Sequence, residues 1–310
     1  RTRIDDSLYG KTSGEIAQEF NRKVVVNMEF KMASAQLFVP DGLAAGPALA
    51  RTTHMAIGAH QDDLEIMAYD GIIKCFQQTD KWFCGIVVTN GSGSPRDDVY
   101  RDYSDEQMRA VRVIEQKKAA VVGEYGAQIL LDYPSKAVKD GGDQRPVDDL
   151  VKILKVAKPE AVYTHNLTDK HETHIGVTLK VIDAIRSLPK KERPSVLYGC
   201  EVWRDLDWMV DSDKTAFDCS AHENLQMALL GVFDSQIAGG KRYDLATMGR
   251  RRAHATYHAS HATDATTGIA FGMDLTPLIA DDDMDVGDFA QELIRRFATD
   301  VAVRIGQLRG

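Results

Sequence analysis

The sequence has little of several features that would assign it to a specialised class of protein. It holds only four cysteines in 310 residues, Cys75, Cys84, Cys200 and Cys219, and no Cys-x-x-Cys pair. These cysteines are too few and too scattered for a disulfide framework, and a thiolate zinc site is not expected. No stretch approaches 18 consecutive apolar residues, so the sequence predicts no transmembrane helix.

A dense block of lysine and arginine is also missing, and the formal net charge is −8. This acidic balance argues against nucleic acid or an anionic membrane as a partner. The hydrophobic share of 44% is ordinary for a globular protein with a core of its own. Because the chain begins at Arg1 and not at Met, we expect a missing upstream segment. We expect a cytoplasmic protein, with a cleaved signal upstream of Arg1 left open.

Residues 1–51 differ from the rest of the chain. The run from Gly14 to Lys23 predicts a short amphipathic helix, and the stretch from Pro40 to Pro47 is rich in glycine, alanine and proline. We predict an N-terminal arm that packs on the main domain or reaches out from it. Such an arm is compatible with a homo-oligomer.

From residue 52 onward, short apolar runs alternate with helical patterns, which is typical of βαβ units and a parallel sheet. Strands are expected over residues 54–59, 83–88, 128–131, 161–164 and 195–200. Helices are expected over residues 65–78, 104–122, 145–156, 172–185, 223–232, 245–258 and 286–305. The pattern predicts a single Rossmann-like, doubly wound α/β domain over residues 52–310, with a mostly parallel sheet and C-terminal additions.

Two polar clusters follow predicted strands at the edge where such sheets bind ligands. His60-Gln-Asp-Asp63-Leu-Glu65 follows the first strand, and the stretch from His165 to His174 follows the fourth. Both clusters combine imidazole with carboxylate. A single His-x-x-Asp or His-x-x-His pair is more often a surface feature than a site, but two such groups at neighbouring strand ends favour a site.

This combination suits a catalytic zinc ion, which takes three protein ligands and leaves one position for water. His60 and Asp63 can converge on one ion, and His174 can supply the third ligand from across the sheet. Asp62 would lie beside the water and could take its proton. The adjacent carboxylates of Asp62 and Asp63 would repel each other without a cation nearby.

The motifs resemble those of the PIG-L/LmbE superfamily of zinc-dependent deacetylases, which act on N-acetylglucosamine-type sugars. The resemblance covers about residues 52–272 and is carried by four groups of residues. These are Ala-His60-Gln-Asp62-Asp63-x-Glu65, Tyr-Thr-His165-Asn followed by Asp169-x-His171-x-x-His174, Thr89-Asn90-Gly91 with Arg112-x-x-Glu115, and Asp234-Ser235-Gln236.

The resemblance implies His60, Asp63 and His174 as zinc ligands and Asp62 as the general base. It further implies that His171 steadies the tetrahedral intermediate, with Asp169 holding that imidazole in its charged form. This chain has Gln61 where the family usually has proline, and Thr173 where it often has aspartate. Neither departure removes a proposed ligand or the proposed base.

We predict a zinc-dependent hydrolase that removes the acetyl group from an N-acetylated amino sugar or its conjugate. We assign substrate contacts to Asn90, Arg96, Arg112 and Gln236. Trp203 and Trp208 are candidates for stacking on a sugar ring, although packing is the commoner role for each. Two alternatives stay open, namely an amidase that cleaves a larger acyl group from an aminosugar conjugate, and a non-catalytic protein of this fold that binds a sugar or a metal.

Overall fold

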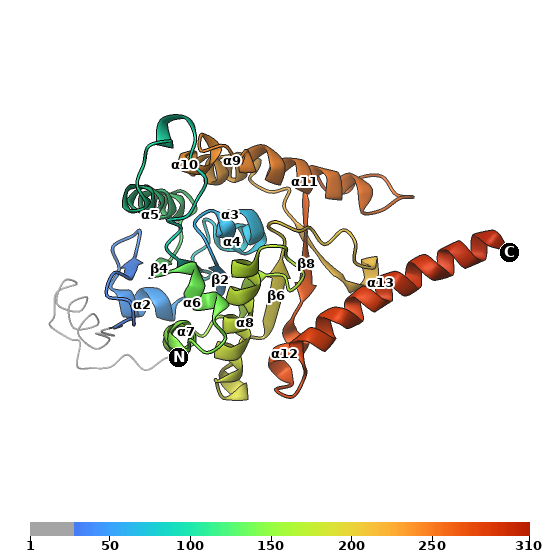
Figure 1. Ribbon diagram of the computed structural model, residues 1–310, viewed down its shortest axis with the longest axis horizontal. Helices are drawn as coiled ribbons and strands as arrows, with labels where there is room; N and C mark the ends of the chain where they lie inside the picture. The colour runs from blue at the N-terminus through green and yellow to red at the C-terminus, as the bar shows by residue number, and fades with distance from the viewer. Residues whose placement is uncertain (1–27) are drawn as a thin grey trace, which may run out of the picture.

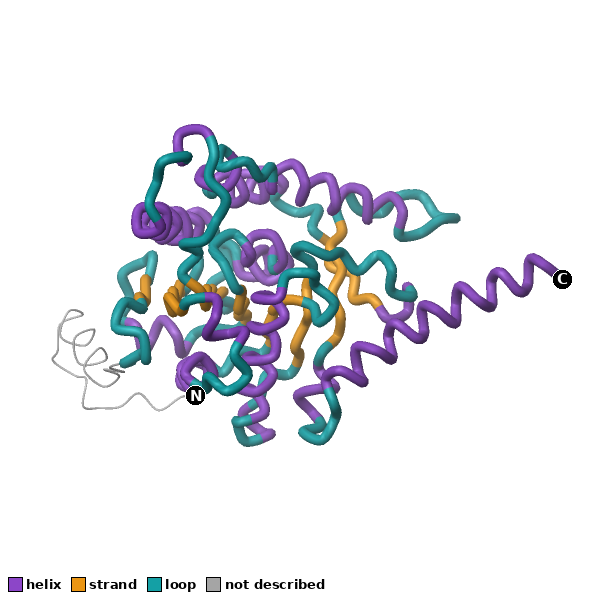
Figure 2. Tube along the Cα trace, viewed as in Figure 1, coloured by secondary structure: helices purple, strands orange, loops and turns teal. Residues whose placement is uncertain are grey.

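The computed structural model describes residues 28–310, and the predicted helix from Gly14 to Lys23 lies outside them. Eight strands form one sheet in the order β1-β4-β3-β2-β5-β6-β8-β7, which runs through the middle of the domain (Figure 2). The strands are β1 (Gln36–Phe38), β2 (His54–Gly58), β3 (Phe83–Thr89), β4 (Ala127–Tyr133), β5 (Ala161–His165), β6 (Val196–Cys200), β7 (Lys214–Asp218) and β8 (Ile269–Asp274).

The five strands expected from the sequence form the parallel part of this sheet, which confirms the doubly wound α/β prediction. β2 lies at the centre, pairing in parallel with β3 on one side and with β5 on the other. The chain extends from β2 to β3 and β4, then returns to build β5 and β6 on the opposite side. The carboxyl ends of β2 and β5 therefore flank the point where strand order reverses, which is where open α/β sheets bind ligands.

Helices cover both faces of the sheet (Figure 1). One face carries α3 (Asp63–Met67), α4 (Tyr69–Cys75), α5 (Asp105–Val122), α9 (Glu223–Gly231), α10 (Asp234–Ile237) and α11 (Tyr243–Tyr257). The other carries α2 (Ala45–Ala50), α6 (Ser135–Lys139), α7 (Arg145–Ala157), α8 (Glu172–Arg186) and α12 (Thr276–Ala280), and α13 (Val286–Arg309) follows. Each face buries its own apolar cluster against the sheet. Among the described residues, no helix is both long and apolar enough to cross a membrane.

The single helix expected over residues 65–78 is instead two short helices, α3 and α4, separated at Ala68. The guanidinium of Arg251, on α11, donates hydrogen bonds to the carbonyl oxygens of Glu65 and Ile66, each at 2.9 Å. These carbonyls lie in the last turns of α3, so a buried arginine from a distant helix stabilises the break. By contrast, the helix expected from residue 104 begins as α5 with a capping box, in which Ser104 and Gln107 hydrogen-bond reciprocally.

Three strands add to the sheet beyond those expected, and all three pair antiparallel. β1 pairs with β4 at one edge, while β8 and then β7 follow β6 at the other. Residues 28–51 of the predicted arm thus pack on the domain, because β1 joins the sheet and α2 contacts α7. The division of the chain at residue 51 stays a prediction.

Gly71 on α4 provides a test of how tightly this layer packs on β5. A Cβ at this position would lie 2.7 Å from Cε2 of Tyr163, whose buried ring is held by a 2.7 Å hydrogen bond to Asp70. We expect Gly71→Ala to lower the free energy of unfolding by about 1–3 kcal/mol through overpacking, although alanine favours helix.

The matched control is Gly249→Ala in the interior of α11, where a Cβ meets no heavy atom within 4 Å. This change should raise the free energy of unfolding by up to about 1 kcal/mol. Urea denaturation of both variants measures the two values, and equal effects at the two positions would contradict the packing argument.

Candidate active site

A cavity of about 560 Å³ opens at the carboxyl ends of β2 and β5. Its floor carries His60, Asp62 and Asp63, at the turn from β2 into α3, and His171 at the start of α8. The remaining wall mixes polar, aromatic and aliphatic residues, and it includes Ile66, Gly91, Ser94, Pro95, Arg112, Ser135, Lys139, Thr173, Val202, Trp203, Gln236, Lys241 and Tyr243. A concave site with convergent ionisable groups at a topological switch point is a candidate active site.

The three predicted metal ligands lie together. Nδ1 of His60 lies 3.2 Å from Nε2 of His174 and 3.4 Å from Oδ2 of Asp63. Nε2 of His174 lies 3.6 Å from Oδ1 of Asp63. Ligands bound tetrahedrally to zinc at about 2.0 Å stand roughly 3.3 Å apart, so the spacing and the donor types fit such an ion.

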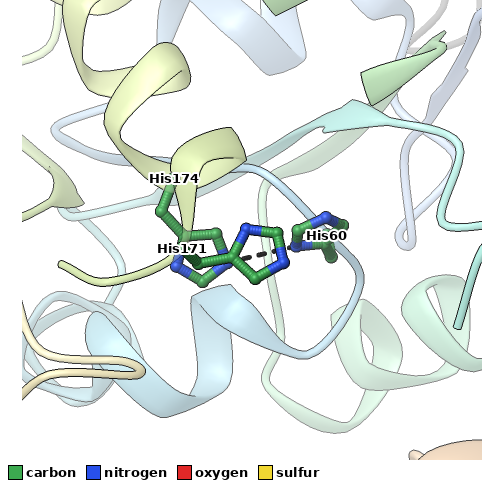
Figure 3. A group of neighbouring side chains, drawn as sticks. All are labelled: His60, His171 and His174. Carbon is green, nitrogen blue, oxygen red and sulfur yellow. Dashed lines mark hydrogen bonds between the residues drawn. The ribbon is translucent and has the colours of Figure 1, made fainter. Parts of the chain in front are cut away.

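Two further histidines belong to the same cluster. The His171 ring lies 5.1 Å from that of His60 and 4.6 Å from that of His174, between ring centroids, and Figure 3 shows these three side chains side by side. The His165 ring stacks on His174 with centroids 3.9 Å apart. Among the described residues, the trios whose single donor atoms all lie close enough for one ion are His60 with His171 and His174, and Asp63 with His165 and His174. The predicted trio differs from both, because its two distances to Asp63 reach different carboxylate oxygens.

Hydrogen bonds distinguish the donors of these histidines. Nε2 of His165 accepts the backbone N–H of Ala59 at 2.9 Å, so that lone pair is already engaged. Nδ1 of His171 accepts the N–H of Thr173 at 3.3 Å, which caps α8. In a neutral His171 ring the proton consequently resides on Nε2.

The pKa values of Asp62 and Asp63 shift in opposite directions although the two carboxylates are adjacent and both buried. Burial would raise the pKa of Asp63, but His174, His165 and His60 together lower it below its ordinary range. Burial raises the pKa of Asp62 well above its ordinary value, Arg112 opposes that shift, and Asp63 adds to it. Asp63 thus belongs to the imidazole cluster, whereas Asp62 faces Arg112 at 3.5 Å.

Asp62 also has an unusual backbone, with φ at 92° and ψ at −30°. This region is unfavourable for a residue with a side chain. The peptide unit that precedes Asp62 is held at both ends by α5. Nη2 of Arg112 donates to the carbonyl oxygen of Gln61, and Oε1 of Gln116 accepts the N–H of Asp62 at 3.3 Å. Arg112 and Gln116, one helical turn apart on α5, thereby stabilise the backbone conformation that sets the direction of the Asp62 side chain.

Gln116 is itself fixed by a buried polar network that the sequence did not predict. Its amide nitrogen donates to Oε1 of Glu65 at 2.9 Å and to Oε1 of Gln128 at 3.3 Å. The hydroxyl of Tyr125 donates to the same Glu65 oxygen at 2.8 Å. Burial raises the pKa of Glu65 to about 7. The only sequence signal was the spacing of Arg112 and Gln116, which places both on one helix face.

The contacts of Asp169 differ from the expectation that it holds the imidazole of His171. Its Oδ2 lies 3.4 Å from Nδ1 of His174 and accepts the N–H of Trp203 at 3.1 Å. Its Oδ1 accepts the backbone N–H of His171 at 2.9 Å. Asp169 therefore orients the ring of His174 and the backbone of His171. Its charge also raises the pKa of His171, against the larger lowering by burial and by the neighbouring imidazoles, and its role toward the His171 ring stays a prediction.

The four predicted substrate contacts fall into two groups. Arg112 and Gln236 line the cavity, whereas Asn90 and Arg96 are not among the described residues that line it. The side chain of Asn90 accepts a backbone N–H two residues further on, and Arg96 pairs with Asp105. A role in substrate binding stays a prediction for all four residues.

Of the two tryptophans considered for stacking on a sugar ring, only Trp203 is among the described residues that line the cavity. Trp203 lines the cavity, with Nζ of Lys241 5.1 Å from its ring centroid and the Tyr243 ring edge-on at 6.1 Å. Trp208 packs instead against Phe297 of α13, with ring centroids 6.1 Å apart.

The strain at Asp62 can be measured by comparing two variants. Asp62→Ala and Asp62→Gly both remove the carboxylate. The difference between their free energies of unfolding therefore does not include the effect of losing that group. Because glycine tolerates a positive φ and alanine does not, we expect Asp62→Gly to be more stable to unfolding by about 1 kcal/mol, after the greater chain entropy of unfolded glycine is subtracted. Urea denaturation tests this, and an alanine variant of equal or greater stability would contradict the strain.

Comparison with known proteins bears on this site. Residues 55–185 match the family model described as PIG-L, GlcNAc-PI de-N-acetylase, and no curated protein matches the chain. Among solved structures, N,N'-diacetylchitobiose deacetylase from Pyrococcus horikoshii is similar at 14% identity and a TM-score of 0.57, with 93% of this chain and 100% of that chain covered.

Two further solved structures are similar over 72% of this chain, each at 14% identity. They are GalB, the 4-carboxy-2-hydroxymuconate hydratase from Pseudomonas putida KT2440, with a TM-score of 0.54 and 95% of that chain covered, and the A40926 pseudoaglycone deacetylase Dbv21, with a TM-score of 0.52 and 97% covered. At these identities the likeness shows the fold. The match over residues 55–185 confirms the resemblance seen in the motifs, and it covers the segment that supplies the histidine and carboxylate cluster.

Proposed function

We propose that this protein is a metal-dependent hydrolase that removes the acetyl group from an N-acetylated amino sugar or its conjugate. One observation carries the proposal. His60 and Asp63 line the floor of a cavity and lie within 3.2–3.6 Å of the buried His174, beside a second buried carboxylate, Asp62, that faces Arg112. The family match over residues 55–185 supports the same reaction class.

We assign the metal to His60, Asp63 and His174, with zinc as the ion that this set of two imidazoles and one carboxylate suits. Of the alternative donors, Nε2 of His165 is engaged with a backbone N–H, and we assign His171 to the substrate rather than to the ion because it lines the cavity. Asp169, at 3.4 Å from Nδ1 of His174, would fix the orientation of that ligand, as carboxylates beside metal-bound histidines do. When bound, the ion would polarise the amide carbonyl and acidify a water molecule.

The reaction then depends on Asp62 and His171, which both line the cavity. Asp62 takes a proton from the water that attacks the amide carbon. His171, with Nδ1 occupied by the Thr173 N–H, offers an Nε2 proton to the carbonyl oxygen as negative charge develops there. The nitrogen of the leaving amine takes a proton from Asp62 or from His171, and the amide C–N bond breaks to give acetate and a free amine.

The cavity wall supports a sugar as the group that carries the amide. Trp203 and Tyr243 provide aromatic surface for a pyranose ring. Gln236, Ser94 and Lys241 provide hydrogen-bonding groups around it. An amidase acting on a larger acyl group would use the same floor, so a substrate panel must separate the two alternatives.

The decisive assay measures acetate release from N-acetylglucosamine and its glycosides, with the matching longer N-acyl compounds as the comparison. We expect the purified protein to bind about one zinc ion per chain, to lose activity on chelation and to regain it with zinc. Asp62→Ala should keep the metal and lose about 100-fold or more in kcat. His174→Ala should lose both the metal and the activity.

The matched control is His261→Ala, which removes an exposed histidine outside the cavity and should leave metal content and turnover unchanged. Full activity of Asp62→Ala would show that the base is wrongly assigned. Faster release of longer acyl groups would favour the amidase. Glycan binding without turnover in zinc-replete buffer would favour the non-catalytic alternative.

Gln116 provides a second prediction, since it holds the backbone of Asp62 from outside the cavity. Gln116→Met keeps the volume but removes the acceptor for the Asp62 N–H. We expect kcat to fall by about tenfold or more, because the Asp62 carboxylate would no longer be held in position next to the attacking water. KM and metal content should change little. Lys118→Met, an exposed change on the same helix, is the control. A rise in KM alone would contradict this positioning role.

A further inference from the structure

The C-terminal helix α13 carries apolar residues that the described part of the chain leaves uncovered. Its first half packs on the body, where Leu293 is buried and Val286 and Phe289 contact the core. The second half extends away from the domain (Figure 1), and every residue from 301 to 310 is exposed. The exposed large apolar side chains of this helix include Ile294, Phe297, Val301, Ile305 and Leu308.

These five side chains form one stripe along the helix, which we call the α13 stripe. At about 100° per residue, they fall within an arc of roughly 80°. Successive members are separated by three, four, four and three residues. This spacing is symmetric about Val301, so the stripe presents the same pattern in both directions along the helix.

We propose that the α13 stripe pairs with the α13 stripe of a second copy of this chain, with the two helices antiparallel and a two-fold axis at Val301. A two-fold interface requires a self-complementary surface. In this arrangement Val301 faces Val301 of the partner subunit, Ile294 faces Leu308 of the partner subunit, and Phe297 faces Ile305 of the partner subunit.

The charges beside the stripe favour the same arrangement. Asp300 and Arg304 lie on one flank of the stripe and pair with each other within the chain, at 3.0 Å. In the antiparallel dimer, Asp300 is level with residue 302 of the partner subunit and so lies between Asp300 and Arg304 of the partner subunit. The two ion pairs thus meet as a cluster of four charges with no net charge. In a parallel two-fold pair this flank would instead face Ala298 and Ala302 of the partner subunit, so no such charge cluster would form.

The opposite flank and the inner end of the stripe are also suited to a second helix. Ala298 and Ala302 line that flank and permit close approach of two helix backbones. At the inner end, Phe297 contacts Trp208 of the body, so the stripe is continuous with apolar surface of the domain. Within residues 28–310 the outer half of α13 is fully exposed from residue 301 onward. A short helix without tertiary packing is marginal in water, and pairing would stabilise it.

The first test is a cysteine at the symmetry axis. In Val301→Cys the two introduced thiols face each other at the helix crossing, within the range of a disulfide, while the four native cysteines are buried. Mild oxidation with copper phenanthroline should crosslink this full-length variant at least about tenfold faster than Val303→Cys, whose side chain is half exposed on the far side of the helix. Equal crosslinking of the two variants would overturn the proposal.

The second test measures mass in solution by light scattering, for a chain of 34.3 kDa. We expect the unmodified protein to show twice the monomer mass and Val301→Asp to show the monomer mass with unchanged thermal unfolding of the domain. Asp300→Arg should weaken the dimer, and Asp300→Arg combined with Arg304→Asp should restore it. A monomer at all concentrations, or a dimer that Val301→Asp leaves intact, would overturn the proposal.

Discussion

The geometry of the candidate site depends on the peptide unit between Gln61 and Asp62. Within four residues the chain must leave β2, turn, and begin α3, and only then do His60 and Asp63 lie on the same side of the turn. The positive φ of Asp62 makes this short turn and directs the two neighbouring carboxylates differently. Because that conformation is unfavourable on its own, it persists through contacts that Arg112 and Gln116 supply from α5. The orientation of the proposed base, Asp62, therefore depends on how α5 packs against the turn that leads into α3.

The same turn concentrates negative charge, since Asp62, Asp63 and Glu65 are all buried within four positions of the chain. Groups from separate elements compensate this charge. Arg112 faces Asp62, the imidazoles surround Asp63, and Tyr125 and Gln116 donate to Glu65. Burying three carboxylates would be costly without these partners. The cluster can form only when β5, α5 and α8 are in place around β2, so the site and the fold are assembled together.

The candidate site residues at the strand ends could be predicted from the sequence. The residues that hold them in place through hydrogen bonds could not. His60, Asp63 and His174 follow apolar runs, and parallel strands bring their carboxyl ends to one edge, so their proximity follows from topology. Gln116 lies in the middle of a helix and looks like any other amide, since its role depends on how α5 docks against the turn. The partner of Asp169 depends on side-chain packing at the start of α8, which spacing does not specify. For the same reason the break between α3 and α4, and the antiparallel strands β1, β7 and β8, were missed: the first depends on a distant arginine, and the others are short or follow irregular sequence.

The floor and the wall of the cavity come from different parts of the chain, and this separates the chemistry from the choice of substrate. The donors and the proposed base lie within residues 55–185, the segment that matches the PIG-L family. Much of the opposite wall lies beyond it, in Trp203, Gln236, Lys241 and Tyr243. Similar folds include both a chitobiose deacetylase and a muconate hydratase at 14% identity, so the scaffold alone does not determine the reaction. A floor held rigidly by the sheet, with a wall built from loops and helices that can change independently, allows one metal-binding arrangement to serve different substrates. Under the proposed function, the choice of acetylated compound therefore depends on the wall, and substitutions within residues 203–243 should alter specificity without altering the proposed metal ligands.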